Sequence, residues 1–145
     1  MSFRVGIGFD AHRLVAGRRL ILGGVAIDYP RGLEGHSDGD ALLHAVADAL
    51  LGAVAAADIG SLFPSDDVRY QGAASRHFVE KALAIIAERG HRVFHVDVVV
   101  IAQEPQLSPY FPAIRENLVT LLVRNESRGG VGGFPSCVAF SPPSS

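Results

Sequence analysis

The sequence predicts an α+β domain of two layers, in which a mixed sheet of about four strands is covered on one face by helices. Two observations favour this fold class. Some short segments alternate apolar with polar or small residues, or are rich in β-branched residues, whereas longer segments repeat apolar residues at helical spacing. Both kinds occur within one chain of 145 residues without an internal repeat, so we expect one layered domain.

Three segments have strand character. In residues 3–10 apolar side chains alternate with glycine or charged residues, and the glycines leave room for a ligand or another backbone to approach closely. Residues 20–27 form a second strand candidate, which turn-forming residues end at 28–32. Residues 93–102 are rich in β-branched residues, which predicts a buried strand.

Three helices are expected from the spacing of apolar residues. The first runs from residue 41 to about residue 56 and is rich in alanine and leucine. The second lies near residues 73–89 and stops at a glycine. The third begins at Pro109 or Pro112. The apolar faces of the second and third helices are expected to consist of Phe78, Val79, Ala82, Leu83 and Ile86, and of Ile114, Leu118, Leu121 and Leu122.

The composition changes after Arg128. Residues 129–145 are rich in glycine, proline and serine. Apart from a short apolar patch at 137–140, they show neither the alternation of a strand nor the apolar spacing of a helix. We therefore divide the chain into a folded domain, residues 1–128, and a tail, residues 129–145, expected to be loop or disorder. No strand is predicted in the tail.

Composition and charge exclude several classes of function. A net charge of −2 and a pI of about 6.3 argue against binding to nucleic acid or to an anionic membrane. A single cysteine, Cys137, excludes a disulfide within the chain and suits a reducing compartment. Neither a targeting segment nor a membrane helix is predicted, so a soluble, cytoplasmic protein is expected.

The strongest candidate for chemistry is a metal-binding group of three residues. Asp10 and His12 are two apart, so in an extended backbone they point to one side, roughly 7 Å apart. His44 lies on the first helix between Asp40 and Asp48, at intervals of four residues. Asp10, His12 and His44 would form a three-ligand set like that of catalytic zinc, with a fourth position open. The alternatives are a polar turn at a strand end and a solvated stripe along the helix.

A second candidate site precedes the first helix. Ser37 or Asp38 is expected to cap this helix, and His36 and Ser37 would lie near its free backbone amides, which favour a phosphate. The alternative is an ordinary cap beside an exposed histidine. The loop from Asp58 to Asp67 offers acceptors for hydroxyl groups, although it also has the composition of a plain surface loop.

In the order in which they occur, these motifs resemble the 2-C-methyl-D-erythritol 2,4-cyclodiphosphate synthase family from about Phe3 to Arg124. The matching motifs are D-A-H at 10–12, L-G-G-V at 22–25, H-S-D-G-D-x-x-x-H at 36–44, D-A-L-L-G at 48–52, D-I-G at 58–60, L-F-P at 62–64 and I-A-Q-E-P at 101–105. The resemblance implies a homotrimer with active sites between subunits. It also implies conversion of 4-diphosphocytidyl-2-C-methyl-D-erythritol 2-phosphate into the cyclic diphosphate and CMP in non-mevalonate isoprenoid biosynthesis.

The resemblance also assigns roles to individual residues. Asp10, His12 and His44 match the zinc ligands, and His36 matches the catalytic residue that steadies the transferring phosphate, with Ser37 beside it. Besides Asp10, His12, His36 and Ser37, the residues implied to bind the erythritol part of the substrate are Asp58, Ile59, Gly60, Phe63, Pro64, Ser65, Asp66 and Asp67. The residues implied to hold the cytidine diphosphate from the adjoining subunit are Ala102, Gln103, Glu104, Pro105, Gln106, Leu107 and Ser108.

The chain departs from the family pattern in two respects. Ser65 and Gln106 stand where an aspartate and a basic residue are expected. Nothing after Arg124 matches the family's K-A-T-T-T-E and G-F-T-G-R-G-E-G segments, apart from a faint echo at Gly133-Phe134. These segments supply a threonine that acts on the transition state and a glutamate for a second divalent ion, Mg²⁺ or Mn²⁺.

Three hypotheses about function therefore stand side by side. The chain is an active synthase, or a homologue that binds metal and nucleotide with little or no turnover, or a metal-dependent phosphoesterase that uses the same three ligands. The absent T-T-x-E segment favours the second hypothesis and predicts strongly reduced activity, because loss of one transition-state donor typically costs roughly 10²–10³ in rate.

Overall fold

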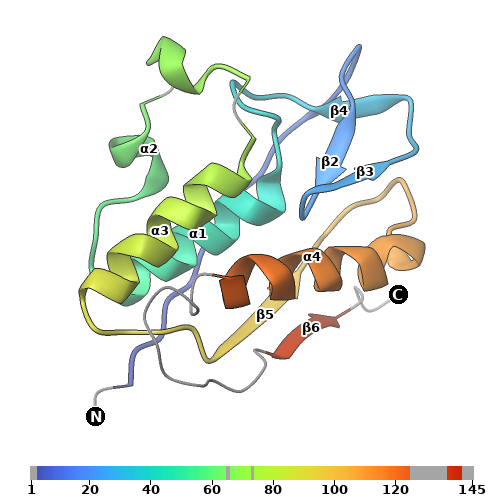
Figure 1. The fold of residues 1–145 in the computed structure, drawn as a ribbon. Helices are drawn as coiled ribbons and strands as arrows, with labels where there is room; N and C mark the ends of the chain where they lie inside the picture. Colours follow the sequence, from blue (N-terminus) through green and yellow to red (C-terminus); the bar gives the residue numbers. More distant parts are fainter. Residues whose placement is uncertain (1–2, 65, 73, 125–136, 142–145) are drawn as a thin grey trace.

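We describe a computed structural model of the chain, covering residues 3–64, 66–72, 74–124 and 137–141. Helices and short strands alternate along these residues (Figure 1). The helices are α1 (Ala41–Ala53), α2 (Ile59–Leu62), α3 (Arg76–Glu88) and α4 (Phe111–Arg124), with 3-10 turns η1 (Val68–Tyr70) and η2 (Ser108–Tyr110). The strands are β1 (Leu14–Ala16), β2 (Leu20–Leu22), β3 (Val25–Ile27), β4 (Arg31–Leu33), β5 (His95–Val99) and β6 (Cys137–Ser141).

The core lies where α1, α3 and α4 meet. Helix α1 packs along α3, and α4 crosses them from the side of β5 and β6 (Figure 1). The apolar residues predicted to line α3 and α4 are all buried, with Val79 and Leu118 completely inaccessible to solvent. The three predicted helices are therefore confirmed, and their apolar spacing identified the buried faces correctly. No helix among the described residues is long and apolar enough to span a membrane.

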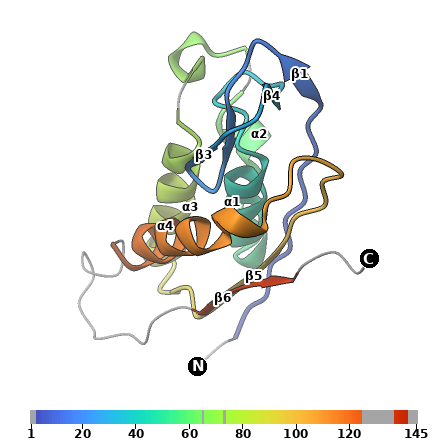
Figure 2. The same ribbon diagram turned by 90° about the vertical axis from the view of Figure 1, so that its right-hand side faces the viewer.

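The described strands form three separate pairs, and a single sheet of four strands is not confirmed. β1 pairs with β4 and β2 with β3, both antiparallel, whereas β5 pairs with β6 in parallel. Figure 2 places the β5–β6 pair below the helices, at the end opposite β1 and β4. A cavity of about 440 Å³ lies between residues 3–8, α1 and β5, so the first segment of the chain does not join this pair.

The strand predicted over residues 20–27 is divided in two. Gly23 and Gly24 adopt positive φ angles of 58° and 75°, and the chain turns there to form the β2–β3 hairpin. Only glycine adopts such angles without steric cost, so the paired glycines set the position of the turn.

Residues 3–10 are extended but are not part of a strand. A Cβ added to Gly6 would lie 1.9 Å from the carbonyl oxygen of Ala49, and one added to Gly8 would lie 1.8 Å from that of Ala45. The glycines therefore allow another backbone to approach, as predicted, and that backbone belongs to α1. On the opposite face the side chains of Phe3, Val5, Ile7 and Phe9 are 76–91% exposed.

The prediction that the tail contains no strand is wrong. Residues Cys137–Ser141 form β6, which pairs with β5 from His95 opposite Cys137 to Val99 opposite Ser141. Local composition did not reveal this strand, because its pairing depends on a partner some forty residues earlier in the chain. The rest of the tail lies outside the described residues, so the division at residue 128 stays a prediction.

Candidate metal and substrate site

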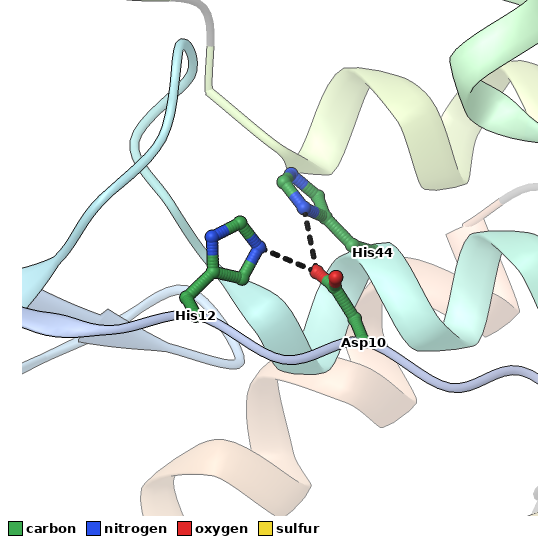
Figure 3. Close-up of side chains that lie close together, drawn as sticks. All are labelled: Asp10, His12 and His44. Carbon is green, nitrogen blue, oxygen red and sulfur yellow. Dashed lines mark hydrogen bonds and ion pairs between the residues drawn. The ribbon is translucent and has the colours of Figure 1, made fainter.

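Asp10, His12 and His44 converge on one point (Figure 3). Oδ2 of Asp10 lies 2.7 Å from Nε2 of His12 and 3.0 Å from Nδ1 of His44. One ligand atom from each residue lies within 4.8 Å of the other two. The fold thus brings the end of the first extended segment against the first turn of α1, a proximity that sequence spacing alone does not establish.

Helix α1 fixes the position of His44 through a cap different from the one predicted. Its N-cap is Asp40, whose Oδ1 accepts a hydrogen bond from the Leu43 amide at 3.0 Å. The expectation that Ser37 or Asp38 caps this helix is therefore wrong. The Asp40 carboxylate also accepts hydrogen bonds from the amides of Gly23 and Gly24, at 2.9 and 2.7 Å, and so joins the β2–β3 turn to α1.

The predicted line of Asp40, His44 and Asp48 is not a solvated stripe. Asp40 is completely buried and His44 is 9% exposed. Burial raises the pKa of Asp40 to about 6, although three backbone amides donate to its carboxylate. Asp48 accepts a hydrogen bond from the Ile59 amide at 3.0 Å and so fixes the start of α2. Of these three residues, only His44 reaches the metal-binding group.

The backbone determines which nitrogen of His12 faces the cluster. Nδ1 of His12 forms a short hydrogen bond with the carbonyl oxygen of Glu34, which can only accept. Nδ1 must therefore carry the proton, and the lone pair of Nε2 points towards Asp10. Burial acts to raise the pKa of Asp10, but its interactions with His44 and His12 outweigh this effect and lower the pKa.

The three residues are a suitable ligand set for a divalent cation. Two imidazole nitrogens and one carboxylate form a common set at catalytic zinc, and they leave a position open for substrate. With Nδ1 of His12 protonated, the neutral ring presents the lone pair of Nε2 to Oδ2 of Asp10 at 2.7 Å, so two acceptors face each other. A cation between these atoms would remove this conflict, so the residues present fit a metal.

His36 and Ser37 lie beside this group but differ in their surroundings. The side chain of His36 is exposed, and its carbonyl oxygen accepts a hydrogen bond from the Gly72 amide at 2.9 Å. The Ser37 hydroxyl is buried, 3.1 Å from Nε2 of His44. Ser37 therefore faces the interior behind His44, whereas His36 is accessible to a ligand.

The described residues 58–64 and 66–67 form more regular structure than the predicted loop. Asp58 caps α2 by accepting from the Ser61 amide at 2.7 Å, and hydrogen bonds from Ser61 lower the pKa of Asp58. Asp67 accepts from the amide and side chain of Arg69, which likewise lowers its pKa. The rings of Phe63 and His44 both pack against Phe78, with centroids 4.9 and 5.5 Å away. This aromatic row connects the segment with the metal-binding group. Ser65 lies outside the described residues.

Residues 102–108 lie against the loop that joins β3 to β4. Oε2 of Glu104 accepts a hydrogen bond from the Tyr29 hydroxyl at 2.8 Å, and Leu107 is buried in the core. The other residues from Ala102 to Ser108 are exposed or partly exposed. Within the described part of the chain, no hydrogen bond or ion pair joins this segment to Asp10, His12 or His44. The segment and the metal-binding group are thus separate features of one copy.

Comparison with known proteins identifies the family. The model of the YgbB family matches residues 3–131. The chain belongs to this family. A relative from Dechloromonas aromatica, named 2-C-methyl-D-erythritol 2,4-cyclodiphosphate synthase, is 58% identical over 138 residues, covering 95% of this chain and 81% of the relative. A relative of the same name from Aquifex aeolicus is 49% identical over 122 residues, or 84% of this chain and 78% of the relative.

Solved structures related to the YgbB family have the same fold. A structure of 2C-methyl-D-erythritol-2,4-cyclodiphosphate synthase superposes with a TM-score of 0.81 at 38% identity, over 97% of this chain and 89% of its own. Its form described as bound to CDP gives the same TM-score at 36% identity and the same coverage. The resemblance drawn from the sequence motifs is therefore confirmed.

Sequence reasoning missed Arg18 and Ser75, which shape this YgbB site, and it gave Asp38 only as a possible helix cap. Arg18 donates to the carbonyl oxygens of Gly35 and Ser37, at 2.6 and 2.8 Å, and so holds the segment before α1. Ser75 and Asp38 meet behind His44. These contacts join residues 17 to 37 positions apart, so the spacing of residues within a helix or strand does not predict them.

Proposed function

We propose that this chain is a phosphorus–oxygen lyase that converts 4-diphosphocytidyl-2-C-methyl-D-erythritol 2-phosphate into 2-C-methyl-D-erythritol 2,4-cyclodiphosphate and CMP. The observation that carries the proposal is the name shared by relatives that are 47–58% identical over 82–95% of the chain. The reaction belongs to non-mevalonate isoprenoid biosynthesis, and we place it in the cytoplasm. These relatives favour a synthase over the general phosphoesterase.

The proposed reaction is an intramolecular phosphoryl transfer. An oxygen of the 2-phosphate attacks the β-phosphorus, the new P–O bond closes the ring, and the bond to the oxygen that bridges the α-phosphorus breaks to release CMP. Such a transfer depends on in-line positioning and on charge placed around the equatorial oxygens. The protein therefore needs to hold both phosphates rather than supply a nucleophile.

We assign the phosphate end of the substrate to the group formed by Asp10, His12 and His44. These residues would bind Zn²⁺ or another divalent cation, which supplies Lewis acidity at a phosphate oxygen. His36, exposed beside the group, would donate to the transferring phosphate. The buried Ser37 would line the same site behind His44. Support for this assignment comes from the convergence of the three ligand atoms within 4.8 Å.

The rest of the substrate is assigned to the two segments that flank this group. Residues 58–67 would bind the erythritol part, since Phe63 is linked through Phe78 to His44. Residues 102–108 would bind the cytidine diphosphate of a neighbouring subunit's substrate. The separation of this second segment from the metal-binding group within one copy supports a site shared between copies.

A homotrimer would cover the exposed apolar face of residues 3–9. Phe3, Val5, Ile7 and Phe9 all project away from α1, and Ile101 is 85% exposed as well. Contiguous exposed apolar side chains of this size mark a protein interface more often than a free surface. We propose that two further copies cover them. A second divalent ion, Mg²⁺ or Mn²⁺, would need a ligand other than the family's glutamate, for which no matching segment occurs in this chain.

The decisive experiment is conversion of the substrate by the purified chain. ³¹P NMR should show the cyclic diphosphate while chromatography shows an equal amount of CMP. Because no T-T-x-E segment matches, we expect turnover roughly 10²–10³ below that of the Dechloromonas relative. Release of inorganic phosphate without cyclic product would instead support the phosphoesterase. Bound CDP with no product at all would support the homologue without turnover.

A further inference from the structure

The hydroxyl of Ser75 has an unusual position for a residue that begins a helix. Ser75 is the N-cap of α3, where serine ordinarily accepts from the first amides of the helix, yet its side chain makes no capping hydrogen bond. The residue is completely buried. Its Oγ lies instead 2.8 Å from Nε2 of His44 and forms a short hydrogen bond with Oδ1 of Asp38.

The chemistry of these groups determines the direction of the hydrogen bonds. The Asp38 carboxylate accepts from the Ser75 amide at 3.0 Å and from the Asp40 amide at 3.1 Å, so it acts as an acceptor throughout. The Ser75 hydroxyl therefore donates its proton to Asp38. The lone pairs of Ser75 Oγ are left facing His44, so Nε2 of His44 carries a proton and donates it.

This direction leaves Nδ1 of His44 without a proton. Nδ1 is the atom that faces Asp10, at 3.0 Å. His12 is held in the opposite way, since Glu34 binds its Nδ1 and leaves Nε2 facing Asp10. His12 therefore presents the lone pair of Nε2 to Asp10, and His44 presents the lone pair of Nδ1 to the same carboxylate. Both arrangements are needed for the three residues to bind one cation.

We infer that Ser75, backed by Asp38, is a positioning residue that holds His44 in the tautomer able to bind a divalent cation through Nδ1. Ser37 is the other hydroxyl near this nitrogen, at 3.1 Å; it accepts from the Gly39 amide at 3.2 Å, and its own proton can go to Ser75 Oγ, 3.3 Å away. Ser75 is closer, fully buried and hydrogen-bonded to a carboxylate, which makes it the stronger acceptor for His44.

The first test measures metal affinity and rests on the metal site proposed above. Zn²⁺ binding to the full chain is measured by competition with a chromophoric chelator. Ser75→Ala should bind Zn²⁺ roughly 10–100-fold more weakly than the wild type, the usual cost of losing a hydrogen bond behind a metal ligand. Ser75→Thr keeps the hydroxyl and should restore most of the affinity. Thr120→Ala, which removes an exposed hydroxyl from α4, is the control and should bind like the wild type.

The outcomes separate this inference from the proposed function. If the wild type binds no Zn²⁺ and no other divalent cation, the proposed metal site is wrong, and the positioning role falls with it. If the wild type binds Zn²⁺ and Ser75→Ala binds it equally well, the metal site stands and the positioning role is overturned.

The second test needs no variant, so it decides the matter even if Ser75→Ala fails to fold. Long-range ¹H–¹⁵N NMR spectra of the Zn²⁺-loaded wild type report which nitrogen of His44 is protonated. We expect a proton on Nε2 of His44 and on Nδ1 of His12. A proton on Nδ1 of His44, with Nε2 bare, would overturn the inference.

Discussion

Gly8 offers the sharpest test of how the fold builds the site, through the substitution Gly8→Ala. This glycine lies against α1 only two residues before Asp10, and an added Cβ would lie 1.8 Å from the carbonyl oxygen of Ala45. The obstacle is backbone of a buried helix, not the end of a flexible side chain. The extended segment must therefore move away from α1, and Asp10 and His12 must move with it.

The size of the displacement follows from the contact. An ordinary Cβ contact begins at 3.4 Å, so the two backbones must separate by about 1.6 Å, the difference between 3.4 and 1.8 Å. Metal–ligand distances tolerate only about 0.2 Å. Positional errors of about 1 Å at a reacting centre can cost 10²-fold in rate. Overpacking of this kind also costs typically 1–3 kcal/mol of folding free energy.

We therefore expect Gly8→Ala to remain folded but to lose at least about 10²-fold in Zn²⁺ affinity and in CMP release. Gly52→Ala is the matched control, because Gly52 lies on α1 facing the same segment and an added Cβ would lie 3.8 Å from the Ile7 carbonyl oxygen. That contact is ordinary, and alanine in a helix is favoured over glycine by up to 1 kcal/mol. Circular dichroism, chelator competition and the CMP assay are run on both variants. Wild-type Zn²⁺ affinity in Gly8→Ala would refute the reasoning.

Three further predictions concern pH, metal and assembly. Because the pKa of Asp40 is raised from 3.8 to about 6 on folding, its contribution to stability is present below about pH 4 and is lost as pH rises through 6, by on the order of 3 kcal/mol. Urea unfolding between pH 4 and 7 should show this fall in the wild type and not in Asp40→Asn, and parallel profiles would contradict it. His12→Ala and His44→Ala should each lose bound zinc in elemental analysis, whereas retention of one equivalent would remove that residue from the site. Ile7→Lys should dissociate the proposed trimer in light scattering, whereas Val68→Lys, at a residue that is also exposed but belongs to η1, should not.

The helices could be predicted because their signals are local. The apolar spacing in residues 73–89 identified the buried face of α3 residue by residue, and the same holds for α4. Periodicity fails for residues 3–10 in an instructive way. The alternation correctly separated the glycine face of this segment from its apolar face. It did not show whether the glycine face packs against a strand or a helix. Here it is α1, and the glycines make that approach possible.

The strands were harder to predict because their pairing is set at long range. β6 lies in a stretch whose composition resembles a loop, and its partner β5 is reached only through α4. The metal-binding residues were predictable because carboxylate and imidazole groups are rare on an apolar helix or at a strand end. Ser75 was not, because a serine before a helix has an ordinary explanation as a cap, and only the structure shows that its hydroxyl points elsewhere.

The residues of the polar segment from His36 to Asp40 have different roles. Ser37 and Asp38 face the interior behind His44, and Asp40 joins the β2–β3 turn to α1. Among these five residues, only His36 has an exposed side chain. Most of the motif therefore holds His44 in place and so maintains the geometry of the metal-binding group. Only His36 is positioned to contact the substrate. Substitutions at Ser37, Asp38 or Asp40 should accordingly weaken metal binding and stability together, whereas His36→Ala should slow turnover and leave Zn²⁺ affinity unchanged.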